Sequence, residues 1–248
     1  MQLHLLGTTG YHPNERRQTA CFMLPELGVV FDAGTGMHRL KPLLQTKELD
    51  VFLSHAHLDH VVGLTYLLGD LWEEKMKRVT VHGEADKLAA IDQHLHAPLI
   101  FPVDHQYANR PLSRGMAVPV AGGGQVTHFS LAHPGGSVGY RLDLPGASMA
   151  YVTDTTAAAD APYVEQIRGV DLLVHECYFH DDQCEFAELT GHSCATPVAQ
   201  VAAAAGVGRL ILVHINPMSV EDDPIGLEAA RAVFPNTEIG EDVQVVEF

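Results

Sequence analysis

Residues 50–60 read DVFLSHAHLDH, an apolar run followed by four side chains that can bind a metal ion. The apolar start of this stretch is typical of a buried strand. Alternate residues of an extended segment point to the same side, so His55 and His57 can share one ion. Asp59 and His60 lie at the turn into the next helix, where they can hold a neighbouring ion. Imidazole and carboxylate are ligands that borderline cations such as Zn²⁺ accept, so the stretch predicts a metal site rather than a metal-free histidine-rich loop.

A site for two ions needs more ligands than this loop offers, and three later residues can supply them. Each follows a strand-like run: His133 in FSLAHPGG, Asp154 in MAYVTDT and His214 in RLILVHINP. Residues at strand ends project from one edge of a sheet, where α/β sites usually form. A buried Asp154 without a partner would be costly, and a position between two cations removes that cost. Taken singly, each of the three is equally well explained as an ordinary turn residue.

Strand-like and helix-like segments are mixed along the whole chain, with a run of consecutive strands in the middle. Periodicity predicts strands at 2–6, 21–24, 29–33, 50–55, 78–83, 116–120, 125–132, 137–143, 147–153, 171–175, 209–214 and 243–248. It predicts helices at 37–44, 61–72, 84–94, 161–168, 196–206 and 224–234, with loops at 97–115 and 176–193. The strand run excludes a simple doubly wound parallel sheet and indicates two mixed sheets with helices outside. The chain carries no repeat or linker, which indicates a single domain over 1–248.

The composition is that of an acidic globular protein. The 248 residues include 31 Asp and Glu against 15 Lys and Arg, a formal net charge of −16. Nucleic-acid binding draws most of its affinity from Lys and Arg on phosphates, so a large nucleic acid is disfavoured as a partner. The N-terminus has no signal-peptide pattern, and no apolar run is long enough for a membrane span. Four cysteines without CxxC spacing indicate reduced thiols, as expected of a cytoplasmic protein.

The sequence resembles the metallo-β-lactamase superfamily, whose HxHxDH signature matches residues 55–60 and is followed by a distal His, Asp and His. Within that superfamily it is most similar to the ribonuclease Z and phosphodiesterase branch, because of the HEC strand end at 175–177 and the GHS-x-A segment at 191–195. The segments that carry the resemblance cover nearly the whole chain. They are LGTTGYHPNERRQTACFML (6–24), VFDAGTG (30–36), SHAHLDHVVGL (54–64), AHPGGSVGYRL (132–142), YVTDT (151–155), DLLVHECYF (171–179), TGHSCATPVAQVA (190–202) and LILVHINP (210–217).

The resemblance implies an α+β fold of four layers, an αβ/βα sandwich of two mixed β-sheets with a site for two divalent ions at one edge. One ion would lie on three histidines and the second on two histidines and an aspartate, with another aspartate bridging them. In this order the implied ligands are His55, His57 and His133, then His60, His214 and Asp59, then Asp154. Zinc is the expected metal, and ligands of these types also suit Mn²⁺ and Fe²⁺.

The resemblance also assigns roles to residues around the ions. His192, in the GHSCAT segment, would face the site as a proton donor, and Glu176 would orient it or act beside it. Asp32 in FDAGTG would anchor the metal-binding loop from behind, since such carboxylates fix the tautomer of ligand histidines. A hydroxide bridged by the ions would attack phosphorus, with Asp59 helping to position it, while His192 protonates the leaving oxygen. The alternative for His192 is a cap on the helix that follows it.

The sequence departs from the tRNA-processing members of this branch at one place. Those enzymes carry a long exosite arm, which clamps the tRNA, between the residues that match His133 and Asp154. Here the two residues are 21 positions apart, and only a strand, a turn at Pro145-Gly146 and a second strand intervene. Relatives without the arm act on smaller phosphodiesters, and the net charge of −16 points the same way. The expected substrate is therefore a small phosphodiester such as a cyclic nucleotide.

Three other functions stay open from the sequence. A ribonuclease Z-type endonuclease that processes tRNA 3′ ends would use the same ions. A thioester or β-lactam hydrolase would also use them and has no need for His192. A metal-holding scaffold or sensor needs no proton donor. The oligomeric state is undetermined, and a homodimer is compatible with each of these functions.

Three further features are less specific. Arg16 or Arg17 in the first loop would either hold a phosphate or belong to a solvated charged loop. The histidines of 93–111 would line either a lid over the substrate or an exposed loop. Cys177 and Cys194 lie close in sequence to the site residues, and we interpret them as small buried thiols.

Overall fold

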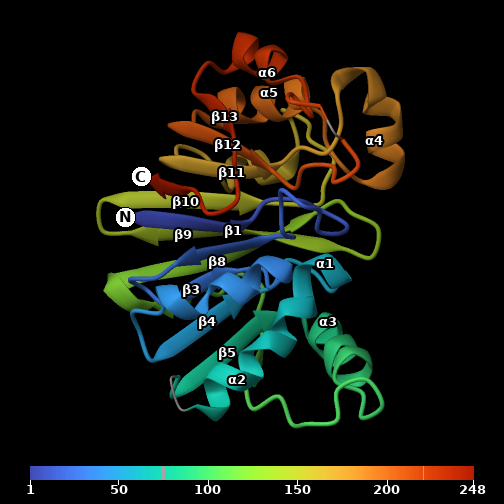
Figure 1. The fold of residues 1–248 in the computed structure, drawn as a ribbon. Helices are drawn as coiled ribbons and strands as arrows, with labels where there is room; N and C mark the ends of the chain where they lie inside the picture. The colour runs from blue at the N-terminus through green and yellow to red at the C-terminus, as the bar shows by residue number, and fades with distance from the viewer. Residues whose placement is uncertain (74–75, 220) are drawn as a thin grey trace.

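The computed structural model describes residues 1–73, 76–219 and 221–248. The described residues form two seven-stranded β-sheets that stack on each other, and helices cover the outer faces (Figure 1). Both sheets contain parallel and antiparallel neighbours. The expected sandwich of two mixed sheets with helices outside is confirmed.

The first sheet holds the N-terminal half of the chain and the last strand. Its order is β14 (Val245–Glu247), β1 (Gln2–Gly7), β2 (Cys21–Leu24), β3 (Val29–Phe31), β4 (Glu48–Phe52), β5 (Arg78–Gly83) and β6 (Ala108–Pro111). Pairing is antiparallel from β14 to β3 and parallel from β3 to β6. Every residue of β2 and β3 is buried, because these strands are covered on both faces.

The second sheet holds the rest of the chain. Its order is β13 (Thr237–Ile239), β12 (Arg209–Val213), β11 (Leu172–Glu176), β10 (Ala147–Val152), β9 (Ser137–Leu144), β8 (Gly124–Leu131) and β7 (Val118–Val120). Strands β7 to β10 pair antiparallel, and β10 to β13 pair parallel. The turn between β9 and β10 is only Pro145-Gly146, and Gly146 takes the positive φ of 88° that this tight turn requires.

The helices are short, and they pack against the outer faces of the sheets. The α-helices among the described residues are α1 (Leu58–Val61), α2 (Leu67–Trp72), α3 (Ala85–Ala90), α4 (Cys184–Thr190), α5 (Ala195–Ala205) and α6 (Leu227–Val233). Figure 1 shows α5 and α6 beside the β11–β13 side of the molecule, and α1, α2 and α3 beside β3 to β5. No helix in the described part of the chain has the length and apolar character that a bilayer crossing demands.

Three clusters of buried side chains define the four layers. One lies between the sheets and contains an aromatic group: Phe31 lies 5.6 Å from Tyr140 and 6.0 Å from Tyr151, measured between ring centroids. A second fills the space between the first sheet and its helices, and a third fills the space between the second sheet and α5. The two sheets therefore have apolar residues on both faces, as the predicted sandwich demands.

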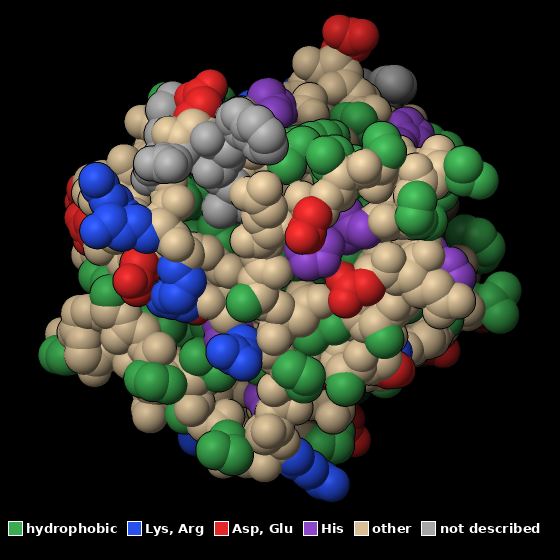
Figure 2. All heavy atoms as spheres, turned by 90° about the horizontal axis from the view of Figure 1, so that it is seen from below, with side chains coloured by type: hydrophobic (Ala, Val, Ile, Leu, Met, Phe, Trp, Pro, Cys, Tyr) green, Lys and Arg blue, Asp and Glu red, His purple; other side chains and the backbone are tan. Residues whose placement is uncertain are grey.

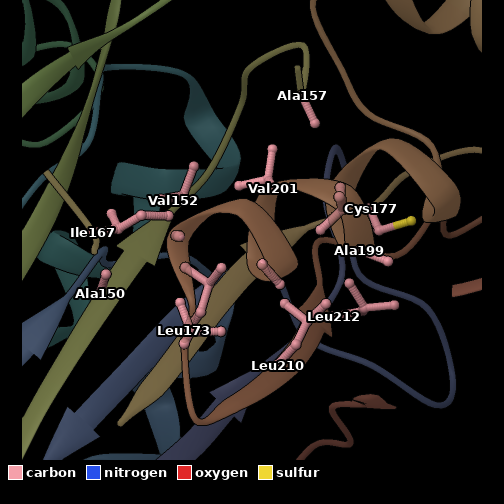
Figure 3. Packing of buried hydrophobic residues seen from close by; sticks show 14 of the residues in the cluster. Ala150, Val152, Ala157, Ile167, Leu173, Cys177, Ala199, Val201, Leu210 and Leu212 are labelled. Carbon is pink, nitrogen blue, oxygen red and sulfur yellow. The ribbon is translucent and has the colours of Figure 1, made fainter. Parts of the chain in front are cut away.

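Helix α5 approaches the second sheet closely because its inner face consists of small residues. Figure 3 shows Ala199 and Val201 on different sides of α5, in the same buried cluster as Leu173 of β11 and Leu210 and Leu212 of β12. All five side chains are fully buried. Each buried leucine contributes about 1.5–3 kcal/mol to folding, so this layer firmly positions the end of β12 and the start of α5. Both of these ends carry residues of the candidate site.

The prediction of one continuous helix over 61–72 is wrong, because the segment is interrupted. The segment is divided into α1, a 3₁₀ turn at Val62–Tyr66, and α2. The backbone N–H of Gly63 donates a hydrogen bond to the carbonyl of Ala33 at 2.7 Å, so it is withdrawn from the helical ladder. A Cβ at Gly63 would lie 2.3 Å from the carbonyl oxygen of Gly34, so only glycine allows this close contact. The division holds α1 against the loop that contains Asp32.

Other predicted elements differ from the structure in kind or in length. The segments 37–44 and 161–168 form short 3₁₀ turns, and Pro42 inside the first lacks the N–H that a helix interior requires. The predicted loop 176–193 contains α4, the predicted loop 97–115 contains β6, and β13 was not expected. β6 and β13 are short edge strands, so their sequences carry little alternation and their pairing depends on the neighbouring strand.

Candidate metal centre

The loop after β4 is held by hydrogen bonds to a neighbouring loop of the same sheet. The backbone N–H of Ser54 donates to Oδ1 of Asp32 at 2.7 Å, and the hydroxyl of Ser54 donates to Oδ2 at 2.8 Å. His57 is extended and stands directly before α1, while Asp59 and His60 belong to its first turn. The extended segment and the helical turn therefore point four side chains toward one place.

The three distal residues lie directly beyond their strands, as predicted. His133 follows β8, Asp154 follows β10 and His214 follows β12. Asp154 and His214 have positive φ angles of 48° and 58°. Side chains other than glycine rarely adopt this conformation, and its strain collects at functional sites. The sharp change in chain direction turns both side chains back toward the HxHxDH loop.

All seven predicted ligands come together in two groups. In each group the ligand atoms lie within 4.8 Å of one another. The first group is His55, His57, His133 and Asp154, and the second is Asp59, His60 and His214.

The carboxylate of Asp154 lies between the two groups. Its Oδ2 is 3.6 Å from Nε2 of His55 and 3.6 Å from Nε2 of His133. Its Oδ1 is 3.3 Å from Nε2 of His60 and 3.4 Å from Nε2 of His214. Each oxygen therefore faces one set of imidazoles, which is the arrangement that a carboxylate between two cations requires.

The polar atoms of the centre are those that a metal ion would satisfy. Nε2 of His55 and Nε2 of His133 are buried and have no hydrogen-bond partner among the described residues. Nε2 of His60 lies 3.2 Å from Nε2 of His214, and both nitrogens face carboxylate oxygens. Buried polar atoms without partners are rare, and a cation accepts the lone pairs of all four nitrogens. The donor set of imidazole and carboxylate fits Zn²⁺, Mn²⁺ or Fe²⁺.

Electrostatics keep the first group ready for a cation. Burial lowers the pKa of His55, His57 and His133, so these imidazoles are neutral near pH 7. Burial also acts to lower the pKa of His60, but the carboxylates of Asp154, Asp59 and Asp32 raise that pKa well above its ordinary value. The centre thus attracts positive charge, whether as a proton on His60 or as a metal ion.

Asp32 orients His60 from behind. The Asp32 side chain is completely buried and its Oδ2 lies 2.8 Å from Nδ1 of His60. The same oxygen accepts a hydrogen bond from the hydroxyl of Tyr151 at 2.7 Å. With Nδ1 donating to Asp32, Nε2 of His60 carries the lone pair and points into the centre. This is the position that the resemblance implies for Asp32.

A backbone carbonyl orients His133 in the same way. Nδ1 of His133 lies 3.0 Å from the carbonyl oxygen of Gly191, which leaves Nε2 toward Asp154. Gly191 has a φ of 77°, and a Cβ there would lie 2.9 Å from Nδ1 of His133 and 2.5 Å from Pro134. Glycine is therefore required before His192 for two reasons, its backbone conformation and this close contact.

His192 and Glu176 form a pair at the side of the centre. Nδ1 of His192 lies 3.2 Å from Oε1 of the fully buried Glu176, which also accepts the N–H of Thr155 at 2.9 Å. One nitrogen of His192 lies within 4.8 Å of ligand atoms of Asp154 and His214. Burial acts to lower the pKa of His192, but the Glu176 carboxylate raises it to about 9. The helix-cap alternative is wrong, because Cys194 is the N-cap residue of α5 and Asp181 accepts the first-turn N–H of Thr196 at 2.9 Å.

Arg17 was expected either to hold a phosphate or to belong to a solvated charged loop, and the structure shows neither arrangement. Its side chain is buried, and its guanidinium donates to the carbonyl of Gly240 and to Glu241, the latter at 2.8 Å. Arg16 is exposed and pairs with the same carboxylate at 2.7 Å. Arg17 therefore joins the first loop to the C-terminal segment and is not a phosphate ligand at the metal centre.

Two histidines of 93–111, His96 and His105, form a separate cluster with Tyr107. Nε2 of His96 lies 2.7 Å from the hydroxyl of Tyr107, and the ring of His105 stacks on Tyr107 at 3.9 Å. His96 and His105 line their own cavity of about 340 Å³, while none of 93–111 is among the described residues lining the cavity at the metal centre. Cys177 and Cys194 are buried thiols, as expected.

The apolar lining of the cavity above the centre was not predicted from the sequence. This cavity has a volume of about 470 Å³. Besides the predicted ligands and His192, its lining includes Tyr11, Tyr178, Phe179, Phe186 and Met218. Two signals in the sequence could have indicated this lining. In the HECYF segment, Tyr178 and Phe179 follow closely after the site residue Glu176. The helix-forming residues of 184–189, before Gly191, favour the helix α4.

Tyr11 also contacts the centre through its backbone. Its N–H donates a hydrogen bond to Oδ2 of Asp59 at 2.7 Å, and Tyr11 has a positive φ of 60°. The adjacent Gly10 touches His214, since a Cβ at Gly10 would lie 2.2 Å from that ring. The first loop therefore supports the second group of ligands with its backbone rather than with its arginines.

Comparison with known proteins identifies the family. Residues 28–215 match a family model described as a β-lactamase superfamily domain. Ribonuclease Z of Parasynechococcus marenigrum (strain WH8102) is 28% identical over 316 aligned positions, which cover 98% of this chain and 96% of the relative. The alignment exceeds the 248 residues of this chain by 68 positions, so the relative has at least that many without a counterpart here. The name of this relative, ribonuclease Z, does not support our expectation that a large nucleic acid is an unlikely partner, which was drawn from the net charge.

Three solved structures share the fold. The metallo-β-lactamase fold protein YhfI from Bacillus subtilis has a TM-score of 0.82 at 20% identity, over 99% of both chains. The short form of human tRNase Z has a TM-score of 0.76 at 19% identity, over 100% of this chain and 99% of that one. A diphosphatase of the PhnP family has a TM-score of 0.76 at 18% identity, over 100% and 96%. The chain thus belongs to the metallo-β-lactamase superfamily, in its branch of ribonuclease Z-like metal-dependent hydrolases.

Proposed function

We propose that this protein is a metal-dependent phosphodiesterase that holds two divalent ions, zinc in the first place. The observation that carries the proposal is the position of Asp154, whose two oxygens face two separate groups of imidazoles at 3.3–3.6 Å. One ion is assigned to His55, His57 and His133, and the other to Asp59, His60 and His214, with Asp154 between them. Bound ions of this kind neutralise the phosphate and lower the pKa of water.

The residues of the chain itself supply orientation and a proton. The leaving oxygen of a phosphodiester requires a proton as the P–O bond breaks, and a histidine at the cavity wall can supply it. His192 lines the cavity, and its Nδ1 is fixed by Glu176, so Nε2 is the nitrogen assigned to this transfer. The buried Glu176 carboxylate stabilises the imidazolium before transfer, as a carboxylate does in other catalytic histidine pairs. Asp59, held by the N–H of Tyr11, is assigned the positioning of the nucleophile beside its role as a ligand.

A small phosphodiester is our preferred substrate, and a tRNA precursor is the second candidate. The connection between β9 and β10 is a tight turn at Pro145-Gly146, so the chain carries no inserted arm between His133 and Asp154. Arg141, on the strand before that turn, pairs with Asp143 at 2.9 Å and adds no free positive charge. The second candidate is favoured by the relative named ribonuclease Z, which aligns over 98% of the chain.

The test is a substrate panel on protein of measured metal content. We expect metal-loaded protein to hydrolyse bis(p-nitrophenyl) phosphate or a cyclic nucleotide, and to lose this activity on chelation and regain it with Zn²⁺ or Mn²⁺. Cleavage of a precursor tRNA at its 3′ end would establish the second candidate instead. Hydrolysis of a thioester or β-lactam, with no phosphodiester in the panel turned over, would overturn both.

A further inference from the structure

The cavity at the metal centre is lined by two chemically distinct sets of residues, each called a wall below. One wall carries ionisable site residues, among them Asp59, Asp154 and His192. The other wall is aromatic and aliphatic: Tyr11, Tyr178, Phe179, Phe186 and Met218. A volume of about 470 Å³ is within the range of pockets that enclose small organic ligands. Such a pocket binds the reacting group at one wall and an attached apolar group at the other.

The apolar wall is open to solvent at its outer part. Phe186 is 53% exposed, Tyr11 is 67% exposed and Met218 is 64% exposed. Large apolar side chains that gather at the mouth of a cavity mark a binding surface. The inner part is fixed: Tyr178 stacks on His192 with a centroid distance of 4.9 Å and an angle of 20°. Phe186 meets Phe179 edge-on at 5.4 Å, so its ring is positioned although it is exposed.

The cavity offers compensation for only one phosphate. None of the described residues that line it is Lys or Arg. Arg16 and Arg17, in the first loop, are both bound to Glu241. On the face seen in Figure 2, Lys and Arg side chains are scattered, and some of them lie beside acidic side chains. A second phosphate in the cavity would meet Asp59 and aromatic rings, and the described lining residues offer it no Lys or Arg.

We infer that the apolar wall is a subsite for an aromatic group esterified to the reacting phosphate, a nucleobase-bearing or aryl alcohol with no second phosphate. The inference rests on the proposed function, since the metal centre must hold the phosphate. Stacking of a base on an aromatic side chain contributes about 1–3 kcal/mol, which corresponds to about 5- to 150-fold in affinity. We assign Phe186 as the specificity-determining residue of this subsite. Of the two phenylalanines of the wall, it is the one exposed to solvent and therefore able to contact a bound ring.

The experiment measures binding of phosphate monoesters to the zinc-loaded protein by calorimetry, so that it does not depend on turnover. Methyl phosphate and phenyl phosphate have the same charged group and differ in the ring. We expect phenyl phosphate and adenosine 5′-monophosphate to bind at least 5-fold more tightly than methyl phosphate. We expect adenosine 3′,5′-bisphosphate to bind more weakly than adenosine 5′-monophosphate. Equal affinity for the methyl and phenyl esters, or tighter binding of the bisphosphate, would overturn the inference.

Variants of α4 locate the subsite. Phe186→Ala should reduce the phenyl-to-methyl affinity ratio at least 3-fold, and Phe186→Tyr should restore it, because the ring is retained. Leu189→Ala is the matched control, since Leu189 is 77% exposed on the same helix and does not line the cavity. Thermal unfolding of each variant checks that the fold is kept. An unchanged ratio in Phe186→Ala would remove that residue from the subsite and overturn the inference.

The binding data also separate this inference from the proposed function. Metal-dependent binding of methyl phosphate with no gain from a ring leaves the phosphodiesterase proposal standing and overturns the subsite. If neither ester binds to the zinc-loaded protein, the metal centre does not hold phosphate and both proposals fall.

Discussion

Oδ2 of Asp32 lies 2.8 Å from Nδ1 of His60, and both side chains are completely buried. Asp32 comes from the loop after β3 and His60 from α1, so the contact joins two segments 28 residues apart. The same carboxylate accepts hydrogen bonds from Ser54 and Tyr151, the latter on β10 of the second sheet. One buried carboxylate therefore connects the two sheets directly behind the metal centre.

Asp32→Asn should lower zinc affinity about 10- to 100-fold, the usual effect of losing the carboxylate partner of a ligand histidine. An asparagine amide can donate to Nδ1 of His60 and so stabilise the tautomer whose lone pair points away from the centre. Zinc affinity is measured by competition with a chromophoric chelator. Asp160→Asn, at an exposed position, is the control and should bind zinc like the unaltered protein. Equal affinity of the two variants would show that Asp32 does not orient His60.

Asp154→Ala should lose metal and activity together. The Asp154 carboxylate faces both groups of imidazoles, and its removal leaves two cations facing each other without an anion between them. Metal content after gel filtration and the rate of bis(p-nitrophenyl) phosphate hydrolysis are the two measurements. A variant that still carries two ions per chain would refute the bridging position of Asp154.

His192→Ala should keep both metals and lose roughly 10²–10⁴-fold in turnover of phosphodiesters with alkyl leaving groups, the usual range for general acid catalysis. A p-nitrophenyl ester leaves well without a proton, so its loss should be much smaller. Comparison of the two leaving groups is the readout, because a defect in folding would lower both rates equally. Equal losses for both substrates would give His192 a structural role.

Asp50→Asn should lower the free energy of unfolding at pH 7 by about 1 kcal/mol. Burial acts to raise the pKa of Asp50, but hydrogen bonds from His82 at 2.9 Å and Arg78 at 3.2 Å lower it below its ordinary value. A carboxyl whose pKa is lower in the folded state stabilises the fold above its unfolded pKa of about 3.9. This contribution is lost as the pH falls through the lower, folded value.

Urea unfolding of metal-free protein checks this prediction, at pH 7 and at the lowest pH where the transition stays cooperative. The difference between Asp50→Asn and the unaltered protein should shrink toward zero on acidification. Asp160→Asn serves again as the exposed control. A difference that is independent of pH would mean that the charge of Asp50 does not contribute to stability.

The sequence by itself determined the ligands as candidates and the class of the fold. HxHxDH places four ligand side chains in six positions, so their proximity follows from local geometry alone. The sites of His133, Asp154 and His214 after apolar runs were readable because buried strands carry continuous apolar sequence. The run of consecutive strands in the middle of the chain was enough to predict two mixed sheets.

The tertiary structure alone decided which side chains share the cavity and what they do there. Arg17 is a charged loop residue in the sequence, yet it is buried against Glu241 and Gly240, which lie more than 220 positions away. Tyr11 and Met218 line the same cavity from opposite ends of the chain. Hydrophobic periodicity indicates which face of a helix or strand is buried, but it does not indicate which other segment packs against that face. Segments that are far apart in the chain form the apolar wall of the cavity. No pattern within any one of these segments predicts its contact with the others, so the proposed substrate class depends on the tertiary structure.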